Sequence, residues 1–209
     1  KHAQSISLLK GLKETMGSSV NFVYAKGSNI FYDPKMEEKS AMFGKNTYRD
    51  SRTKEELLKE AVETANKSDV ILLAIGESAE MSGECSSRTN LEIPQAQKDL
   101  LQELLKTGKP VVLVLFNGRP LVLKQEKETV PAILDVWFAG SEAGYAIADV
   151  LFGDYNPAGR LTQTWVKDIT DLPDLLDYNI RNGRTYQYFK GKPLYAFGHG
   201  LSYTTFKYN

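Results

Sequence analysis

The sequence has few of the residues and motifs that support metal or cofactor chemistry. It contains one cysteine and two histidines in 209 residues, which excludes an intrachain disulfide and a cysteine-based zinc site. His2 and His199 lie too far apart to suggest a pair of metal ligands. A Gly-x-Gly-x-x-Gly fingerprint, a P-loop and a Gly-x-Ser-x-Gly elbow are all missing. We therefore expect no cofactor, no metal and no serine-hydrolase chemistry.

An excess of charge of either sign is also missing. Lysine and arginine total 26, aspartate and glutamate total 26, and the formal net charge is zero. This balance argues against a nucleic-acid partner, because nucleic-acid-binding domains carry a basic face. No apolar run approaches the roughly 18 residues of a transmembrane helix, so we expect no membrane partner. The first residues lack the apolar core of a signal peptide and do not begin with methionine. We expect the chain to come from the middle of a longer protein.

Hydrophobic periodicity predicts alternating helices and strands. Helices are predicted over 5–16, 53–66, 94–107 and 141–151, with a short helix near 34–43. Strands are predicted over 20–25, 70–75, 111–116 and 132–138. The later strands are apolar on both faces, which predicts an α/β fold: a three-layer sandwich with a mainly parallel sheet. We interpret 1–209 as one domain in which 153–209, rich in glycine, proline and tyrosine, forms an irregular C-terminal extension packed on the sandwich.

The most informative segment is the loop 76–94, GESAEMSGECSSRTNLEIP, which follows a buried strand and precedes a helix. Open α/β sheets bind ligands at the carboxyl ends of their strands, and connections this long are usually functional. Right-handed crossovers should bring the loop beside 117–120 and 139–141. The loop contains four glutamates, Glu77, Glu80, Glu84 and Glu92. Any of them is a candidate general acid, although a solvated surface glutamate is the commoner case; Glu92 is also placed to favour the N-terminus of the following helix.

Other side chains each have a structural and a functional interpretation. Arg88 is placed to pair with Glu84, to bind a polar substrate or, most simply, to pin the loop to the domain. Cys85 has no histidine partner and is better read as a small packed residue than as a nucleophile. His199 lies between two glycines, which is typical of a structural histidine in a tight turn. Trp137 either stacks on a sugar ring or, as we favour, fills the core.

Three blocks of the sequence carry more information than spacing alone. They are SGECSSRTNLEIPQAQKDLLQELLKTGKPVVLVLFNGRPL, ILDVWFAGSEAGYAIADVLFGDYNPAGRLTQTW and YFKGKPLYAFGHGLSYTTF. In this order they resemble the C-terminal α/β-sandwich domain of family 3 glycoside hydrolases, with most likeness to the bacterial periplasmic β-glucosidases. The resemblance covers essentially the whole chain.

The resemblance implies a retaining exo-glycosidase acting on terminal β-linked oligosaccharides or glycosides. In that family a preceding TIM-type barrel supplies the nucleophilic aspartate, and the sandwich domain supplies the general acid/base glutamate from a loop over the sugar pocket. The match places that glutamate at Glu84 and gives Arg88 a loop-positioning or substrate-binding role, with Glu77 and Glu80 as alternatives. It also implies a periplasmic or secreted location. A non-catalytic structural or carbohydrate-binding domain is the alternative function.

The sequence departs from the family pattern in ways that suggest a fragment. The barrel and its nucleophile are absent, and the single Ser-Asp pair, Ser68-Asp69, stands at the entry to a buried strand. The chain begins just after the first strand of the family's domain, and the fibronectin-like domain that often follows is missing. We therefore expect a sheet without its first strand, whose open edge is disordered or covered by a neighbouring chain. We also expect an inactive fragment with a mobile loop 76–94.

Overall fold

The computed structural model describes residues 4–40, 48–205 and 207, so His2 lies outside the described residues. The chain divides into two compact units. The sheet unit comprises Val23–Phe138 and Val166–Leu172, and the helix-pair unit comprises Lys1–Phe22, Ala139–Trp165 and Pro173–Asn209. The interpretation of 1–209 as a single domain with a packed tail stays a prediction.

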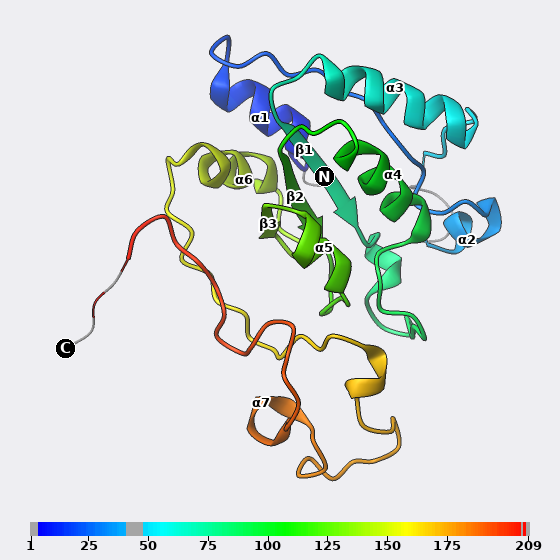
Figure 1. Cartoon of the computed structure of the whole chain (residues 1–209), viewed down its shortest axis with the longest axis vertical. Helices are drawn as coiled ribbons and strands as arrows, with labels where there is room; N and C mark the ends of the chain where they lie inside the picture. The colour runs from blue at the N-terminus through cyan, green and yellow to red at the C-terminus, as the bar shows by residue number, and fades with distance from the viewer. Residues whose placement is uncertain (1–3, 41–47, 206, 208–209) are drawn as a thin grey trace. The chain divides into compact units, whose positions relative to one another are not determined.

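The sheet unit is built on a small open parallel sheet. Among the described residues its strands are β1 (Ile71–Gly76), β2 (Val111–Phe116) and β3 (Ala132–Asp135), in the order β1-β2-β3 (Figure 1). Leu113 on the central strand is fully buried and pairs in register with Leu73 on one side and Ile133 on the other. The α/β class with a parallel sheet is therefore confirmed. The last strand is shorter than predicted because Trp137 has a φ of +51°, outside the β region.

Along the chain, helices precede the first strand of the sheet unit and then alternate with its strands. They are α2 (Pro34–Lys39), α3 (Lys54–Asn66), α4 (Gln95–Leu105) and α5 (Lys124–Thr129), with 3₁₀ turns η2 (Ala79–Met81) and η3 (Ile169–Asp171). The predicted capping box opens α3: the Glu56 N–H donates to Thr53 Oγ1 (3.2 Å), and the Thr53 N–H donates to Glu56 Oε2 (2.8 Å). Helices α3 and α4 lie side by side (Figure 1). Helix α5 was not predicted, because its six residues, KQEKET, include no apolar side chain and so show no helical period.

The predicted strand over 20–25 is wrong. Residues 21–29 form neither helix nor strand, and Val23 and Tyr24 are 54% and 65% exposed. Alternating polarity favours an extended backbone, but a strand also needs a neighbour with unpaired N–H and C=O groups. Within the described residues, β2 is the one strand that pairs with β1, so the other edge of β1 has no neighbouring strand. Coverage of that edge by a neighbouring chain stays a prediction.

A side chain holds the end of β1 in place of a neighbouring strand. The Gly76 N–H donates to Gln97 Oε1 (2.6 Å), and Gln97 Nε2 donates to the Gly76 carbonyl (3.0 Å). Gln97 is buried on α4. Gly76 has a φ of +138°, and a Cβ there would lie 1.9 Å from the Phe116 carbonyl oxygen, so only glycine fits. The point where the loop 76–94 leaves the sheet is therefore fixed.

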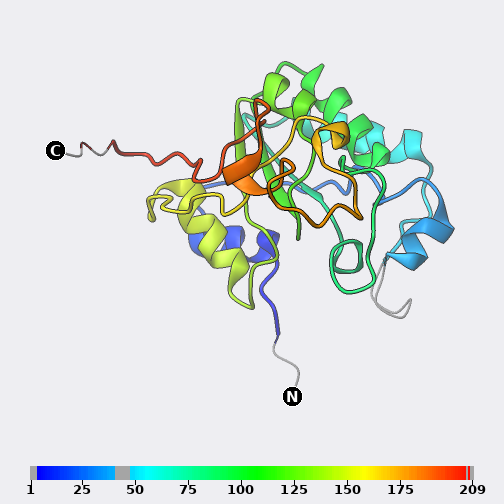
Figure 2. The same cartoon turned by 90° about the horizontal axis from the view of Figure 1, so that it is seen from below.

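The helix-pair unit contains two packed helices and the irregular C-terminal extension. Helix α1 (Leu8–Met16) packs on α6 (Ala143–Phe152) (Figure 2). A Cβ on Gly11 would lie 2.1 Å from the carbonyl carbon of Gly144, so two glycines allow the helices to approach this closely. Among the described residues that follow α6 in this unit, the regular structure consists of the short helix α7 (Thr185–Tyr188) and a β-bridge between Trp165 and Tyr195. Among all described helices, none is long and apolar enough to cross a membrane.

Candidate active-site loop

The loop 76–94 starts at a buried glutamate. Glu77 directly follows β1, its N–H donates to the Phe116 carbonyl (2.7 Å), and its side chain is fully enclosed. One carboxylate oxygen accepts from the Gly118 N–H at 3.0 Å, and the other forms an ion pair with Arg88 Nη1 and lies 3.5 Å from Arg119 Nε. A buried carboxylate needs such partners, because an unpaired one is costly. Glu77 therefore joins the loop to the turn that follows β2.

Arg88 lies against Glu77 and the end of the loop, away from the predicted partner Glu84. Its Nη2 donates to the Glu92 carbonyl at 2.8 Å, and only 15% of its side chain is exposed. Among the described residues no ion pair joins Arg88 to Glu84. The guanidinium thus bridges the first and last parts of the loop, which supports the loop-positioning interpretation. A direct role in binding substrate stays a prediction.

A second arginine, Arg119, holds the middle of the loop, and sequence reasoning missed it. Its Nη2 donates to the carbonyls of Met81 (2.7 Å) and Ser86 (2.6 Å). The sequence Asn-Gly-Arg-Pro at 117–120 by itself indicates only a turn. The position of Arg119 in the sequence could have indicated this role. An arginine that follows a buried parallel strand lies at the edge of the sheet from which the long loop emerges. The predicted proximity of the loops 76–94 and 117–120 is therefore confirmed, whereas 139–141 belongs to the other unit.

Glu84 stands in the short tip between the two carbonyls that Arg119 holds. We call residues 82–85 the tip. Glu84 is exposed, and within the described part of the chain no hydrogen bond or ion pair of its carboxylate is found. Its neighbour Cys85 is an exposed free thiol with a φ of +59°, which corrects the expectation of a packed residue. The tip is thus sharply turned and leaves Glu84 exposed. Mobility of the loop stays a prediction.

The two remaining glutamates of the loop differ in their surroundings. Glu92 pairs with Lys98 Nζ at 2.6 Å, across the start of α4. Glu80 lies on η2, half-buried, and its carbonyl accepts from Ser86 Oγ at 2.8 Å. Glu80 therefore remains the alternative to Glu84 as an available carboxylate, whereas Glu77 and Glu92 are both engaged.

A polar residue stands at the carboxyl end of each strand of the sheet. At the ends of β2 and β3, these residues are Asn117 and Asp135, and some of their hydrogen-bonding atoms are unsatisfied within the ranges that the structure describes. Asn117 follows β2 and is fully buried; its Nδ2 donates to the Arg119 carbonyl (2.9 Å), but its Oδ1 finds no hydrogen-bond partner among the described residues. Asp135 ends β3, and its buried Oδ2 likewise finds no partner in the described part of the chain. Burial raises the pKa of Asp135 to about 6, against the opposing effect of hydrogen bonds from the Trp137 N–H and the Asn117 side chain.

His199 and Trp137 were the other two candidates from the sequence, and both lie against other parts of the protein. His199 stacks on Tyr195 with 4.9 Å between ring centroids, and its carbonyl accepts from the Leu161 N–H (2.8 Å). Trp137 is half-buried, with the positive φ that ends β3. The described residues contain no group of three or more metal-ligating side chains.

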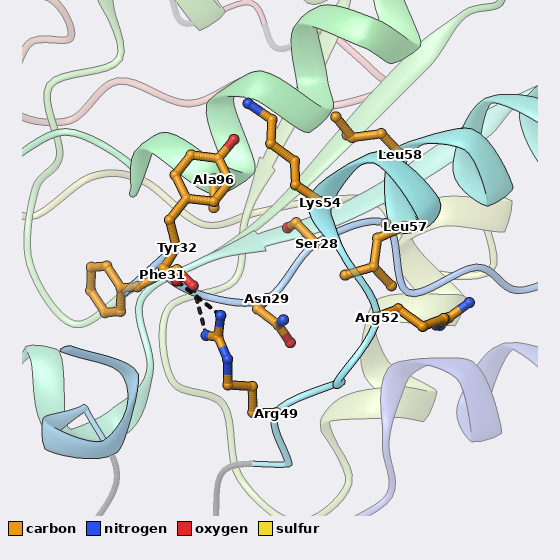
Figure 3. A pocket seen from close by; sticks show the side chains of 11 residues that line it. Ser28, Asn29, Phe31, Tyr32, Arg49, Arg52, Lys54, Leu57, Leu58 and Ala96 are labelled. Atoms are coloured by element: carbon orange, nitrogen blue, oxygen red, sulfur yellow. Dashed lines mark hydrogen bonds between the residues drawn. The ribbon is translucent and has the colours of Figure 1, made fainter. Parts of the chain in front are cut away.

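A small pocket elsewhere in the sheet unit is lined by Arg49, Arg52 and Lys54 among others (Figure 3). Arg49 donates to the carbonyls of Phe31 and Tyr32, each at 2.9 Å, and the other two cations pair with nearby carboxylates. The space measures about 40 Å³, whereas pockets for small molecules measure roughly 300 Å³ or more. The pocket is structural and does not compete with the loop as the functional site.

Comparison with known proteins identifies the family. The model of the glycosyl hydrolase family 3 C-terminal domain matches residues 1–203. The chain belongs to glycoside hydrolase family 3. It is 43% identical over 215 aligned positions to the periplasmic β-glucosidase of Salmonella typhimurium, covering 97% of the chain and 28% of that protein. It is 39% identical to a β-xylosidase of Formosa agariphila, covering 97% of the chain and 26% of that protein.

Solved structures of family 3 enzymes share the fold. A family 3 exo-β-xylosidase, solved in complex with a xylobiose aziridine probe, superimposes with a TM-score of 0.79 at 28% identity. That match covers 98% of the chain and 25% of the xylosidase. The chain thus spans about a quarter of the length of the relatives it matches. It is the C-terminal domain type of β-glucosidase- and β-xylosidase-like enzymes, as the sequence blocks predicted.

Proposed function

We propose that this domain supplies the general acid/base of a retaining exo-β-glycosidase and that Glu84 is the residue. The observation that carries the proposal is the contrast among the loop's carboxylates. Glu77 is enclosed by arginines and Glu92 is paired with Lys98, whereas Glu84 is exposed on a tip whose two ends are held. A proton donor must reach the glycosidic oxygen, so an outward carboxyl on a restrained tip suits the role.

Retaining glycosidases use two carboxyl groups about 5–5.5 Å apart on opposite sides of the glycosidic bond. One attacks the anomeric carbon; the other protonates the leaving oxygen and then removes a proton from the attacking water. In this proposal Glu84 performs the second role, and the nucleophile comes from a barrel domain elsewhere in the longer protein. The domain alone is therefore expected to be inactive.

The relatives suggest the substrate class and location of the longer protein. Proteins similar to this chain are named as β-glucosidases and β-xylosidases, and one of them is named as periplasmic. We infer a terminal β-linked glucoside or xyloside as substrate and a periplasmic or secreted location. Both inferences draw on family membership, since the loop contacts distinguish neither sugar.

The experiment compares Glu84→Gln with Glu80→Gln and Glu92→Gln in the full-length protein that contains this chain. With aryl β-glucosides and β-xylosides, Glu84→Gln should lower kcat by about 10²–10⁴-fold, with partial recovery in azide. Glu92→Gln should change kcat by less than about threefold, since Glu92 is already paired with Lys98. A selective loss in Glu80→Gln would transfer the role to Glu80. Unchanged turnover in all three variants would favour the non-catalytic structural or carbohydrate-binding function instead.

A further inference from the structure

We propose that Arg119 is a positioning residue for Glu84, acting by closing the base of the tip onto the sheet. The proposal rests on the proposed function of Glu84 and goes beyond it by naming the group that fixes where that carboxyl stands. Arg119 contacts neither substrate nor the Glu84 carboxylate in this role. It acts through the backbone on both sides of it.

The hydrogen bonds of Arg119 Nη2 hold the two ends of the tip together. Arg119 Nη2 donates to the Met81 carbonyl at 2.7 Å and to the Ser86 carbonyl at 2.6 Å. These carbonyls flank residues 82–85, so the two N–H groups of a single amino group tie together the residues before and after the tip. Ser86 Oγ adds a bond to the Glu80 carbonyl at 2.8 Å. The position of Glu84 therefore depends on where this guanidinium lies.

The guanidinium is itself held from the sheet side. Its Nε lies 3.5 Å from the enclosed carboxylate of Glu77, and 23% of the arginine side chain is exposed. Its backbone is fixed because the buried Asn117 amide donates to the Arg119 carbonyl at 2.9 Å. The adjacent Gly118 N–H donates to Glu77 at 3.0 Å. A chain of contacts thus connects the ends of β1 and β2 to the tip.

Only arginine can make this set of contacts. A guanidinium presents five N–H donors in a rigid plane, so one nitrogen donates to two carbonyls while another lies at ion-pair distance from a carboxylate. A lysine ammonium is a single point on a flexible stem. Arg88 does not duplicate the function, since it bonds Glu77 and the Glu92 carbonyl, beyond the tip. A displacement of about 1 Å at a catalytic group can lower a rate by about 10²-fold.

The test compares Arg119→Lys, Arg119→Gln and Glu84→Gln in the full-length protein on two aryl β-glycosides. A phenyl glycoside has a poor leaving group that needs protonation, and a 2,4-dinitrophenyl glycoside has a good one that does not. For both Arg119 variants, kcat/KM should fall by about 10–100-fold with the phenyl substrate and by less than about threefold with the dinitrophenyl substrate. Arg52→Lys is the matched control, because Arg52 pairs with Asp50 and Glu60 away from the loop; it should change neither value.

Combining Arg119→Lys with Glu84→Gln distinguishes a loss of Glu84 positioning from a general loss of enzyme structure. If Arg119 acts through Glu84, adding Arg119→Lys to Glu84→Gln should lower kcat/KM for the phenyl substrate by less than about threefold more. Equal losses on both substrates, additive losses in the double variant, or a collapse of thermal stability in both Arg119 variants would overturn the positioning role. A selective loss in Glu84→Gln with unchanged Arg119 variants would overturn only this inference. Unchanged Glu84→Gln would overturn the proposed function, and the positioning role with it.

Discussion

Replacing Asp135 by asparagine should stabilise the protein at neutral pH and change its stability far less at pH 4. Asp135 ends β3, its buried Oδ2 has no hydrogen-bond partner among the residues that the structure describes, and burial raises its pKa from 3.8 to about 6. The raised pKa means that the folded protein disfavours the ionised carboxylate. Below about pH 4 the side chain is protonated in the folded and the unfolded state, so the penalty is absent. Above about pH 6 it is ionised in both states, and the penalty is complete.

The magnitude follows from the two pKa values. They differ by about 2, and each pKa unit corresponds to about 1.4 kcal/mol, so the carboxylate lowers the free energy of unfolding by at most about 3 kcal/mol above pH 6. Asparagine removes the charge but keeps a polar group at the site. We expect a net gain of about 1–3 kcal/mol at pH 7.5, which for a domain of this size raises Tm by a few degrees to about 10 °C.

Thermal unfolding of the wild type and Asp135→Asn at a series of pH values between 4 and 7.5 measures the effect. Asp99→Asn is the matched control, since it makes the same chemical change at a carboxyl group whose pKa is lowered instead of raised, so its effect on stability should be opposite. Hydrogen bonds from Lys54, Tyr32 and Gln95 lower the pKa of Asp99 to about 2. Its stabilising contribution is therefore present above about pH 4 and is lost as the pH falls toward 2. Asp99→Asn should lower Tm at pH 7.5. An Asp135→Asn gain that is the same at pH 4 and pH 7.5, or no gain at either, would refute the reasoning.

Two further predictions concern local stability, measured by denaturant unfolding. Gly76→Ala should destabilise the protein by more than about 3 kcal/mol, because its Cβ would collide with the Phe116 carbonyl at 1.9 Å. Gly108→Ala, also at positive φ but in open space, should cost only about 1 kcal/mol, and equal costs at both glycines would contradict the clash. Thr53→Ala should lower stability by about 1 kcal/mol by removing the cap that bonds the Glu56 N–H, and Thr53→Ser should retain it. A serine variant as unstable as the alanine variant would argue against the capping bond.

Local sequence patterns were sufficient to predict those elements whose structure depends on residues within the same segment. The capping box at Thr53, the apolar faces of the helices and the continuously apolar runs of β1 and β2 carry their information within a few residues. The three sequence blocks likewise identified the family, because they retain the order and spacing of the family domain. The parallel α/β class follows from these local features combined with the rules of chain connection.

Tertiary structure decided what depends on partners distant in the sequence. The segment 20–25 has the pattern of a strand, but no strand pairs with it among the described residues, so it stays irregular. The surroundings of Glu77, Glu84 and Glu92 cannot be told from the sequence, and their contacts show an enclosed carboxylate, an exposed one and one paired with Lys98. Arg119 is 33 residues from Ser86 along the chain, so its bond to the end of the tip appears only when parallel strands bring their carboxyl ends to one edge. The sequence by itself determined the longer helices, the apolar strands and the family. Only packing between distant segments decided that Glu77 is enclosed and Glu92 is paired with Lys98 while Glu84 is exposed.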